Sequence, residues 1–152
     1  MNPDEFRRRI LLAWASLRLQ HVLMLARVLR DQHSAQRHFA VELLKDSQEA
    51  LQKASKFVVS IDDYYHNVDE NGLYRHCLNT ARVLSPDESL SRLFVLPLES
   101  LPNGNSCLRL LIVVAHEITD GLSMFHWMSH LIRILNTPLP EFGEKIELPS
   151  HP

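Results

Sequence analysis

The sequence predicts an α/β chain, in which helices alternate with short strands. Residues 3–19 carry apolar side chains at helical spacing, and residues 38–43 alternate between polar and apolar. Residues 107–135 contain an apolar run that leads through a short polar turn into a second helical pattern. We therefore expect a sheet of few strands with helices packed against it.

Composition limits the classes of protein to which the chain can belong. With 152 residues, 45% of them hydrophobic, we expect one domain over 1–136 and a Pro-rich tail or linker over 137–152. The net charge of −2 lacks the cationic excess of nucleic-acid-binding proteins. The apolar runs fall short of the roughly 20 residues that span a membrane. No signal peptide pattern is present and there are only two cysteines, so we expect a cytoplasmic protein without disulfides.

The sequence predicts a helix over residues 3–19, but the segment after it fits either a helix or a strand. For residues 3–19, Asn2 suits the N-cap and Pro3 the first helical position. The segment 22–30 has no Gly or Pro to end a helix, yet its start is apolar all round, as in a central strand. We favour a strand that forms a hairpin with residues 38–43 and leave the helix as the alternative.

The middle of the chain is read from capping and turn signals. Asp46, with Glu49 three residues later, predicts a helix that ends near Phe57. The stretch 58–89 is the least readable, and we assign turns to residues 61–72 and 85–87.

The last third of the chain carries the signals of two strands and a helix. Residues 90–96 and 107–115 are predicted strands, joined by a hairpin loop at 97–106. Residues 121–135 form the final helix, which we expect to be mostly buried because apolar residues cover most of its circumference.

The segment around His116 carries the strongest chemical signal. An apolar strand delivers His116 at its C-terminal end, and Asp120-Gly121 begins the helix. Crevices form beyond strand ends in α/β layers, and histidine is the usual general base near neutral pH. Gly121 leaves room for a substrate or another segment to approach the backbone. The alternative is purely structural, with Asp120 as helix N-cap, Gly121 in a tight turn and His116 an ordinary strand-end histidine.

His116-x-x-x-Asp120-Gly121 resembles the HxxxDG signature of the CoA-dependent acyltransferase superfamily. That group includes chloramphenicol acetyltransferase, plant and fungal HxxxD acyltransferases and peptide condensation domains. The resemblance implies an α+β two-layer fold, with a mixed sheet and helices on one face. It implies that His116 is the general base that activates a hydroxyl or amine acceptor, and that Asp120 orients the loop by pairing with an arginine. Acyl-CoA is the implied co-substrate, with no permanently bound cofactor.

Two departures from the family pattern qualify the resemblance. Condensation domains usually carry two adjacent histidines, and Ala115 occupies the first position here, which favours simple acyl transfer from acyl-CoA. Family members also have a second, similar half with an Asp-Phe-Gly-Trp-Gly-like motif, which this sequence lacks. We therefore expect an N-terminal half, either a fragment or a truncated member, that needs self-association or a C-terminal half. The alternative is a catalytically silent half that serves as an interaction or dimerisation module.

One further spacing is compatible with a pair of metal ligands. His126 and His130 lie four residues apart on one helical face, but no neighbouring glutamate or cysteine cluster supports zinc binding. We therefore expect no metal and assign both to a polar arc of the final helix.

Overall fold

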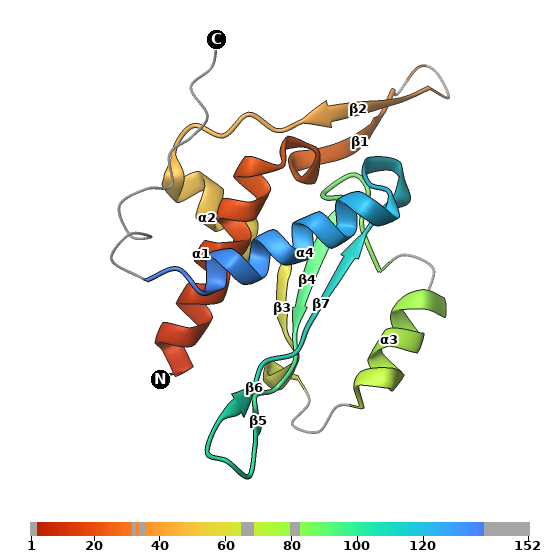
Figure 1. Ribbon diagram of the computed structural model, residues 1–152. Coiled ribbons are helices and arrows are strands. Elements are labelled where there is room, and N and C mark those ends of the chain that lie inside the picture. Colours follow the sequence, from red (N-terminus) through yellow and green to blue (C-terminus); the bar gives the residue numbers. More distant parts are fainter. Residues whose placement is uncertain (1–2, 32, 34–35, 65–68, 80–82, 139–152) are drawn as a thin grey trace.

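The computed structural model describes residues 3–31, 33, 36–64, 69–79 and 83–138 (Figure 1). Most of the predicted tail, residues 139–152, lies outside this description. The helices are α1 (Pro3–Gln20), α2 (Ser47–Ser55), α3 (Glu70–Asn79) and α4 (Gly121–Leu135), with 3-10 turns η1 (Val22–Leu25), η2 (Ile61–Asp63) and η3 (His116–Ile118). The strands are β1 (Ala26–Arg30), β2 (Arg37–Val41), β3 (Val58–Ser60), β4 (Ser91–Val95), β5 (Glu99–Ser100), β6 (Ser106–Cys107) and β7 (Leu110–Val114).

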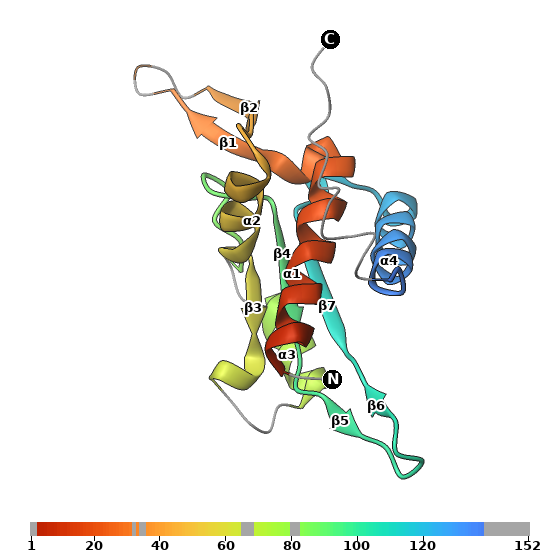
Figure 2. The ribbon, with the colours of Figure 1, turned by 90° about the vertical axis from the view of Figure 1, so that its left-hand side faces the viewer.

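A three-stranded mixed sheet lies at the centre. Its order is β3-β4-β7, with β3 parallel and β7 antiparallel to β4. Two separate antiparallel pairs, β1-β2 and β5-β6, extend from it. Figure 2 shows α1 crossing one face of the central sheet, with α2 and α4 beside it and α3 on the opposite side. The predicted α/β class, a mixed sheet with helices packed on a face, is confirmed.

The hydrophobic core lies between α1, α4 and the central sheet. Alternate residues of a strand point to the same face, so Leu93 and Val95 of β4 both face inward, and Ile112 of β7 lies opposite Leu93. Trp14 and Leu17 of α1 have no exposed surface. Burying these large apolar side chains provides the main stabilisation and holds β7 in place.

The segment 22–30 combines both structures that the sequence allowed. Residues Val22–Leu25 form the 3-10 turn η1, and Ala26–Arg30 form a strand that pairs with Arg37–Val41. The favoured hairpin is therefore confirmed, with its first strand shorter than expected. The alternating side chains of the second strand do not mark a buried face, because Phe39 is 60% exposed.

Residues 46–57 follow the prediction and residues 58–89 depart from it in part. Asp46 accepts a hydrogen bond from the backbone N–H of Glu49, as an N-cap does, and α2 follows. Residues 58–60 form a strand parallel to β4, and the stretch predicted as turns contains the start of α3. None of the described side chains of α3 is buried, so its apolar residues do not belong to the core.

Helix α4 has the predicted bounds, but the prediction that it is mostly buried is wrong. Only Trp127, Leu131 and Ile134 are buried, which is one stripe of the helix. Leu122 is 82% exposed and Phe125 74% exposed on the outer side. Apolar composition alone could not show that this outer face has no cover among the described residues.

The end of α4 is tied to α1 by Arg9. Its guanidinium donates hydrogen bonds to the carbonyl oxygens of Leu135 and Thr137, at 2.8 and 2.6 Å. A cation at a helix C-terminus is stabilised by the helix dipole.

None of the described helices is both long and apolar enough to cross a membrane.

Candidate active site

The segment that carries the motif is held by the fold at two points. At its start, Ala115 donates its backbone N–H to the carbonyl oxygen of Leu90, at 2.8 Å, which extends the β4-β7 ladder by one residue. At its middle, Ile118 is buried in the core, so the 3-10 turn η3 is anchored by one apolar side chain. His116 therefore lies on a short turn supported by rigid elements on both sides, which suits a side chain that must be held in place.

Asp120 is the N-cap of α4. Its carboxylate accepts a hydrogen bond from the backbone N–H of Ser123 at 2.7 Å. Hydrogen bonds from Ser123 hold the pKa of the Asp120 carboxyl below its usual value. Within the described residues no arginine forms an ion pair with Asp120, in contrast to the pairing that the resemblance implied. Asp120 therefore orients the start of α4 through the helix backbone.

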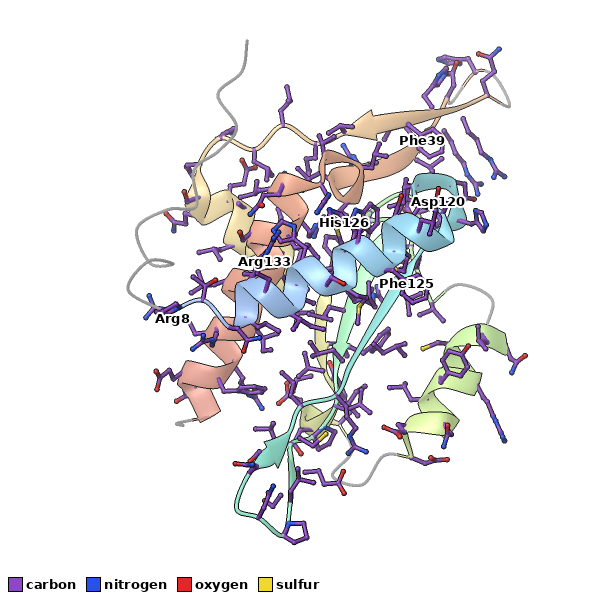
Figure 3. The ribbon with its side chains drawn as sticks, viewed as in Figure 1. Arg8, Phe39, Asp120, Phe125, His126 and Arg133 are labelled. Carbon is purple, nitrogen blue, oxygen red and sulfur yellow. The ribbon has the colours of Figure 1, made fainter. Side chains whose placement is uncertain are left out.

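His116 and Gly121 both face open space. The side chain of His116 is exposed, and so is Gly121. A Cβ atom at Gly121 would meet no other described atom within 4 Å. Figure 3 labels Asp120 at the start of α4, with Phe39 on β2 in the same upper region. The described part of the chain thus positions the three motif residues together but leaves the space in front of them unfilled.

A cavity of about 690 Å³ borders this segment. The two sequence neighbours of His116, Ala115 and Glu117, contribute to its wall. The β1-β2 hairpin forms much of the remaining wall, with residues Val28, Leu29, Arg30, Arg37, His38 and Phe39. The loop before β4 forms the rest of the cavity wall with Pro86 and Asp87. A hydrogen bond of 2.6 Å from the N–H of Val28 to the carbonyl oxygen of Pro86 joins this loop to the hairpin. A substrate-sized space therefore borders the segment that carries His116, although the His116 side chain itself is not part of the wall.

The sequence did not indicate that these hairpin side chains lie near His116. They precede it by about eighty residues in the chain, and only the tertiary structure brings them together. The one local signal was the pair of basic residues at the inner ends of the hairpin strands, Arg30 and Arg37.

Three histidines form a cluster where α1 ends against α4. The imidazoles of His21 and His130 are hydrogen-bonded at 3.0 Å, and the ring centroid of His126 lies 5.8 Å from that of His21. Trp127 covers the cluster, with its ring centroid 5.5 Å from that of His21. No group of three potential ligands in the described chain is arranged to hold a metal ion. His126 and His130 therefore belong to the α1–α4 contact, which His21 completes.

This cluster predicts a pH-dependent stability. Burial, together with the charge of neighbouring His130 and His126, lowers the pKa of His21 below its usual 6.5. Burial, Arg133 and His126 lower the pKa of His130. The folded protein therefore binds fewer protons than the unfolded chain, so stability is lost as the pH falls below about 6.5.

The measurement is urea unfolding of wild type and His130→Gln at pH 7.5 and 5.5. We expect the variant to lose less stability between the two pH values than wild type does. His33→Gln, exposed in the loop between β1 and β2, is the control and should behave as wild type. Equal losses in wild type and His130→Gln would contradict this assignment.

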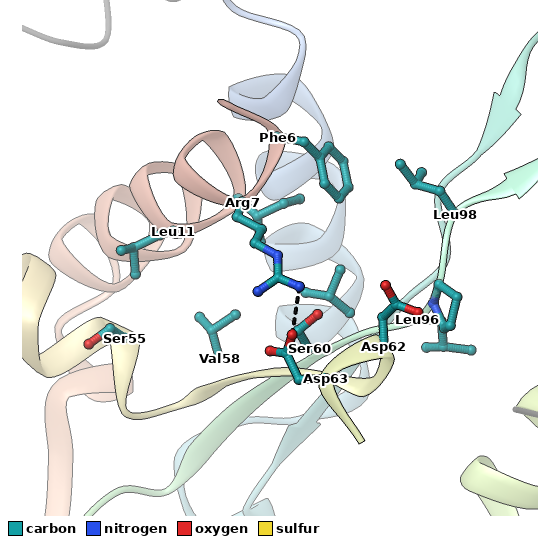
Figure 4. A pocket seen from close by; sticks show the side chains of 13 residues that line it. Phe6, Arg7, Leu11, Ser55, Val58, Ser60, Asp62, Asp63, Leu96 and Leu98 are labelled. Carbon is teal, nitrogen blue, oxygen red and sulfur yellow. Dashed lines mark hydrogen bonds and ion pairs between the residues drawn. The ribbon is translucent and has the colours of Figure 1, made fainter. Parts of the chain in front are cut away.

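A second cavity, of about 370 Å³, lies between the start of α1, β3 and η2 (Figure 4). Its walls are mainly apolar, with Phe6 and Leu11 from α1 and Val58 from β3. Arg7 and Asp63 form an ion pair of 2.6 Å along it. Both charges are already neutralised by each other, and no motif residue reaches this cavity.

Comparisons with known proteins bear on the fold. No family model matches the sequence, and no curated protein matches it. Among solved structures, the fold is similar to that of a trichothecene 15-O-acetyltransferase from Fusarium sporotrichioides, with a TM-score of 0.65 and 14% sequence identity. The match covers 98% of this chain and 30% of that one. The chain therefore has the fold of part of an acetyltransferase and spans less than a third of its length.

Proposed function

We propose that the chain is part of an acyltransferase that moves an acyl group from acyl-CoA to a hydroxyl or amine acceptor. The observation that carries the proposal is the placement of His116 on a supported turn after β7, between two residues that line a cavity. Similarity to part of an acetyltransferase fold supports the same reaction class, since that neighbour is described as a 15-O-acetyltransferase.

His116 is the general base in this proposal. Its imidazole takes the proton from the acceptor O–H or N–H, while the acceptor oxygen or nitrogen attacks the thioester carbonyl. A carbon–oxygen or carbon–nitrogen bond forms, the carbon–sulfur bond breaks, and the imidazolium returns the proton to the departing thiolate. The reaction needs no redox partner and no metal.

In this proposal Asp120 and Gly121 position the base and its surroundings and take no part in proton transfer. Asp120 holds the first turn of α4 by its bond to Ser123 and thereby sets the path of the loop that carries His116. Gly121 leaves the space beside the base open to the acceptor. Because the described residues leave His116 exposed, a second half or a second copy of the chain would complete the channel and exclude water.

Thiol release from acetyl-CoA tests the proposal. The full chain, alone and joined to any C-terminal continuation of its reading frame, is incubated with alcohols and amines of different sizes. We expect thiol release that depends on the acceptor, together with the acylated acceptor in the product mixture. Absence of acylated product from every acceptor, with both forms of the protein, would contradict the proposal.

The second candidate is a silent half that serves as a dimerisation module. Exposed apolar residues on the outer face of α4 favour it, namely Leu122, Phe125 and Ile132. This candidate predicts concentration-dependent dimers in analytical ultracentrifugation, abolished by Phe125→Ser, and no acyl transfer. A monomer at all concentrations would exclude it.

A further inference from the structure

Two arginines of the β1-β2 hairpin lie directly opposite each other. In the strand register Arg30 pairs with Arg37, so their side chains project from the same face of the hairpin. Like charges at directly opposed positions destabilise an antiparallel pair. The pair therefore carries a cost that hairpin formation alone does not explain.

Within the described residues, neither Arg30 nor Arg37 forms an ion pair with a carboxylate. Other arginines of the molecule do, as with Arg7 to Asp63 and Arg109 to Glu70. The opposed pair thus places two guanidinium groups, neither of them in an ion pair among the described residues, at one end of the hairpin.

That place is the cavity beside the candidate base. Arg30, Arg37 and His38 line the hairpin side of the cavity, and Ala115 and Glu117 line the side of the motif. His116 itself does not line the cavity, so an anion bound to the arginines would lie in the space next to the segment that carries the candidate base.

The rest of the wall determines which way a ligand would lie. Val28, Phe39 and Leu90 are apolar and suit an uncharged arm. Asp87 and Glu117 also contribute to the wall, and their charges would repel a phosphate from their side. A ligand with one anionic end is thereby directed to place that end on the hairpin.

We propose that Arg30 and Arg37 form a phosphate subsite that holds the nucleotide phosphates of the acyl-CoA donor. Guanidinium groups bind phosphate oxygens through paired, charge-assisted hydrogen bonds. Bound there, the phosphates neutralise the opposed arginines, and the pantetheine arm runs along the apolar wall toward His116. This subsite rests on the proposed acyl transfer, which names the donor.

Calorimetric titration of the full chain with CoA tests the subsite. Arg30→Gln and Arg37→Gln each remove one charge, and we expect each to weaken CoA binding about tenfold, with the double variant near the detection limit. Arg27→Gln is the matched control, because Arg27 lies on the same strand but outside the cavity wall. It should leave CoA binding unchanged.

A second readout uses the stability of the hairpin without ligand. Removing one of two opposed charges relieves repulsion, so Arg37→Gln should raise the Tm by about 1–3 °C while it weakens CoA binding. A residue that merely supported the hairpin would lower the Tm when replaced.

Probes that lack particular groups identify the anion. Pantetheine has no phosphate and should bind all variants equally weakly, whereas inorganic phosphate should compete with CoA in wild type only. If succinate competes as well as phosphate does, the subsite binds the carboxylate of an acceptor and the phosphate assignment is overturned. Failure of wild type to bind CoA, or equal CoA affinity of wild type and both variants, also overturns it.

The outcome is separable from that of the proposed function. His116-dependent acyl transfer with an unchanged KM for acyl-CoA in Arg37→Gln overturns the subsite alone. Loss of CoA binding in the arginine variants, in a protein without acyl transfer, supports the subsite while the proposed function fails.

Discussion

Replacing Trp14 by alanine lowers the free energy of unfolding by about 3–5 kcal/mol, the usual cost of truncating a buried aromatic side chain. Trp14 has no exposed surface and packs in the cluster that joins α1 to Leu93 of the sheet. The cavity left behind cannot collapse, because rigid strands border it. Urea unfolding measures the effect, and the second tryptophan, Trp127, remains as the fluorescent probe.

Trp14→Phe is the matched control. Among the described residues the indole N–H of Trp14 has no hydrogen-bond partner, so phenylalanine loses volume but no hydrogen bond. We expect a smaller loss, of about 1–2 kcal/mol. Equal losses for Ala and Phe would mean that the indole N–H matters more than the packing and would contradict this account of the core.

Elements with a local signal were predicted from the sequence. The bounds of α4 follow from Asp120 and Gly121 at its start, and α2 follows from the cap at Asp46. The strands β4 and β7 follow from apolar runs. These signals are contained within a few residues, so no tertiary information was needed.

Elements that depend on contacts with distant parts of the chain were not predicted from the sequence. Helix α3 is short and has no described side chain buried in the core, and it lies in a stretch rich in turn-forming residues. The 3-10 turn η1 follows α1 without a Gly or Pro, and it is positioned by the core around the buried Met24. Likewise the exposure of Phe125 on α4 reflects a face that the described residues leave uncovered.

The candidate site also has a part that the sequence predicts and a part that only the fold reveals. The relation of His116 to Asp120 is a spacing in the sequence, and the resemblance to the HxxxDG signature rests on it. The arginine pair and the contact of His21 with His130 join segments far apart in the chain, which only the fold brings together. The predicted pairing of Asp120 with an arginine has no counterpart among the described residues.

Replacing His116 by alanine should lower kcat/KM for acyl transfer by about 10²–10⁴, the usual contribution of a general base. The side chain is exposed, so its removal leaves no cavity and should leave stability within about 0.5 kcal/mol of wild type. The effect therefore separates catalysis from folding. His76→Ala removes an exposed histidine from α3 and is the matched control.

The most direct test of the proposed acyl transfer is the rate at which acylated acceptor forms from acyl-CoA. The rate is measured for wild type, His116→Ala and His76→Ala at equal concentrations of folded protein. We expect wild type and His76→Ala to form product at the same rate and His116→Ala to form almost none. Unchanged product formation by His116→Ala would contradict the assignment of His116 as the base.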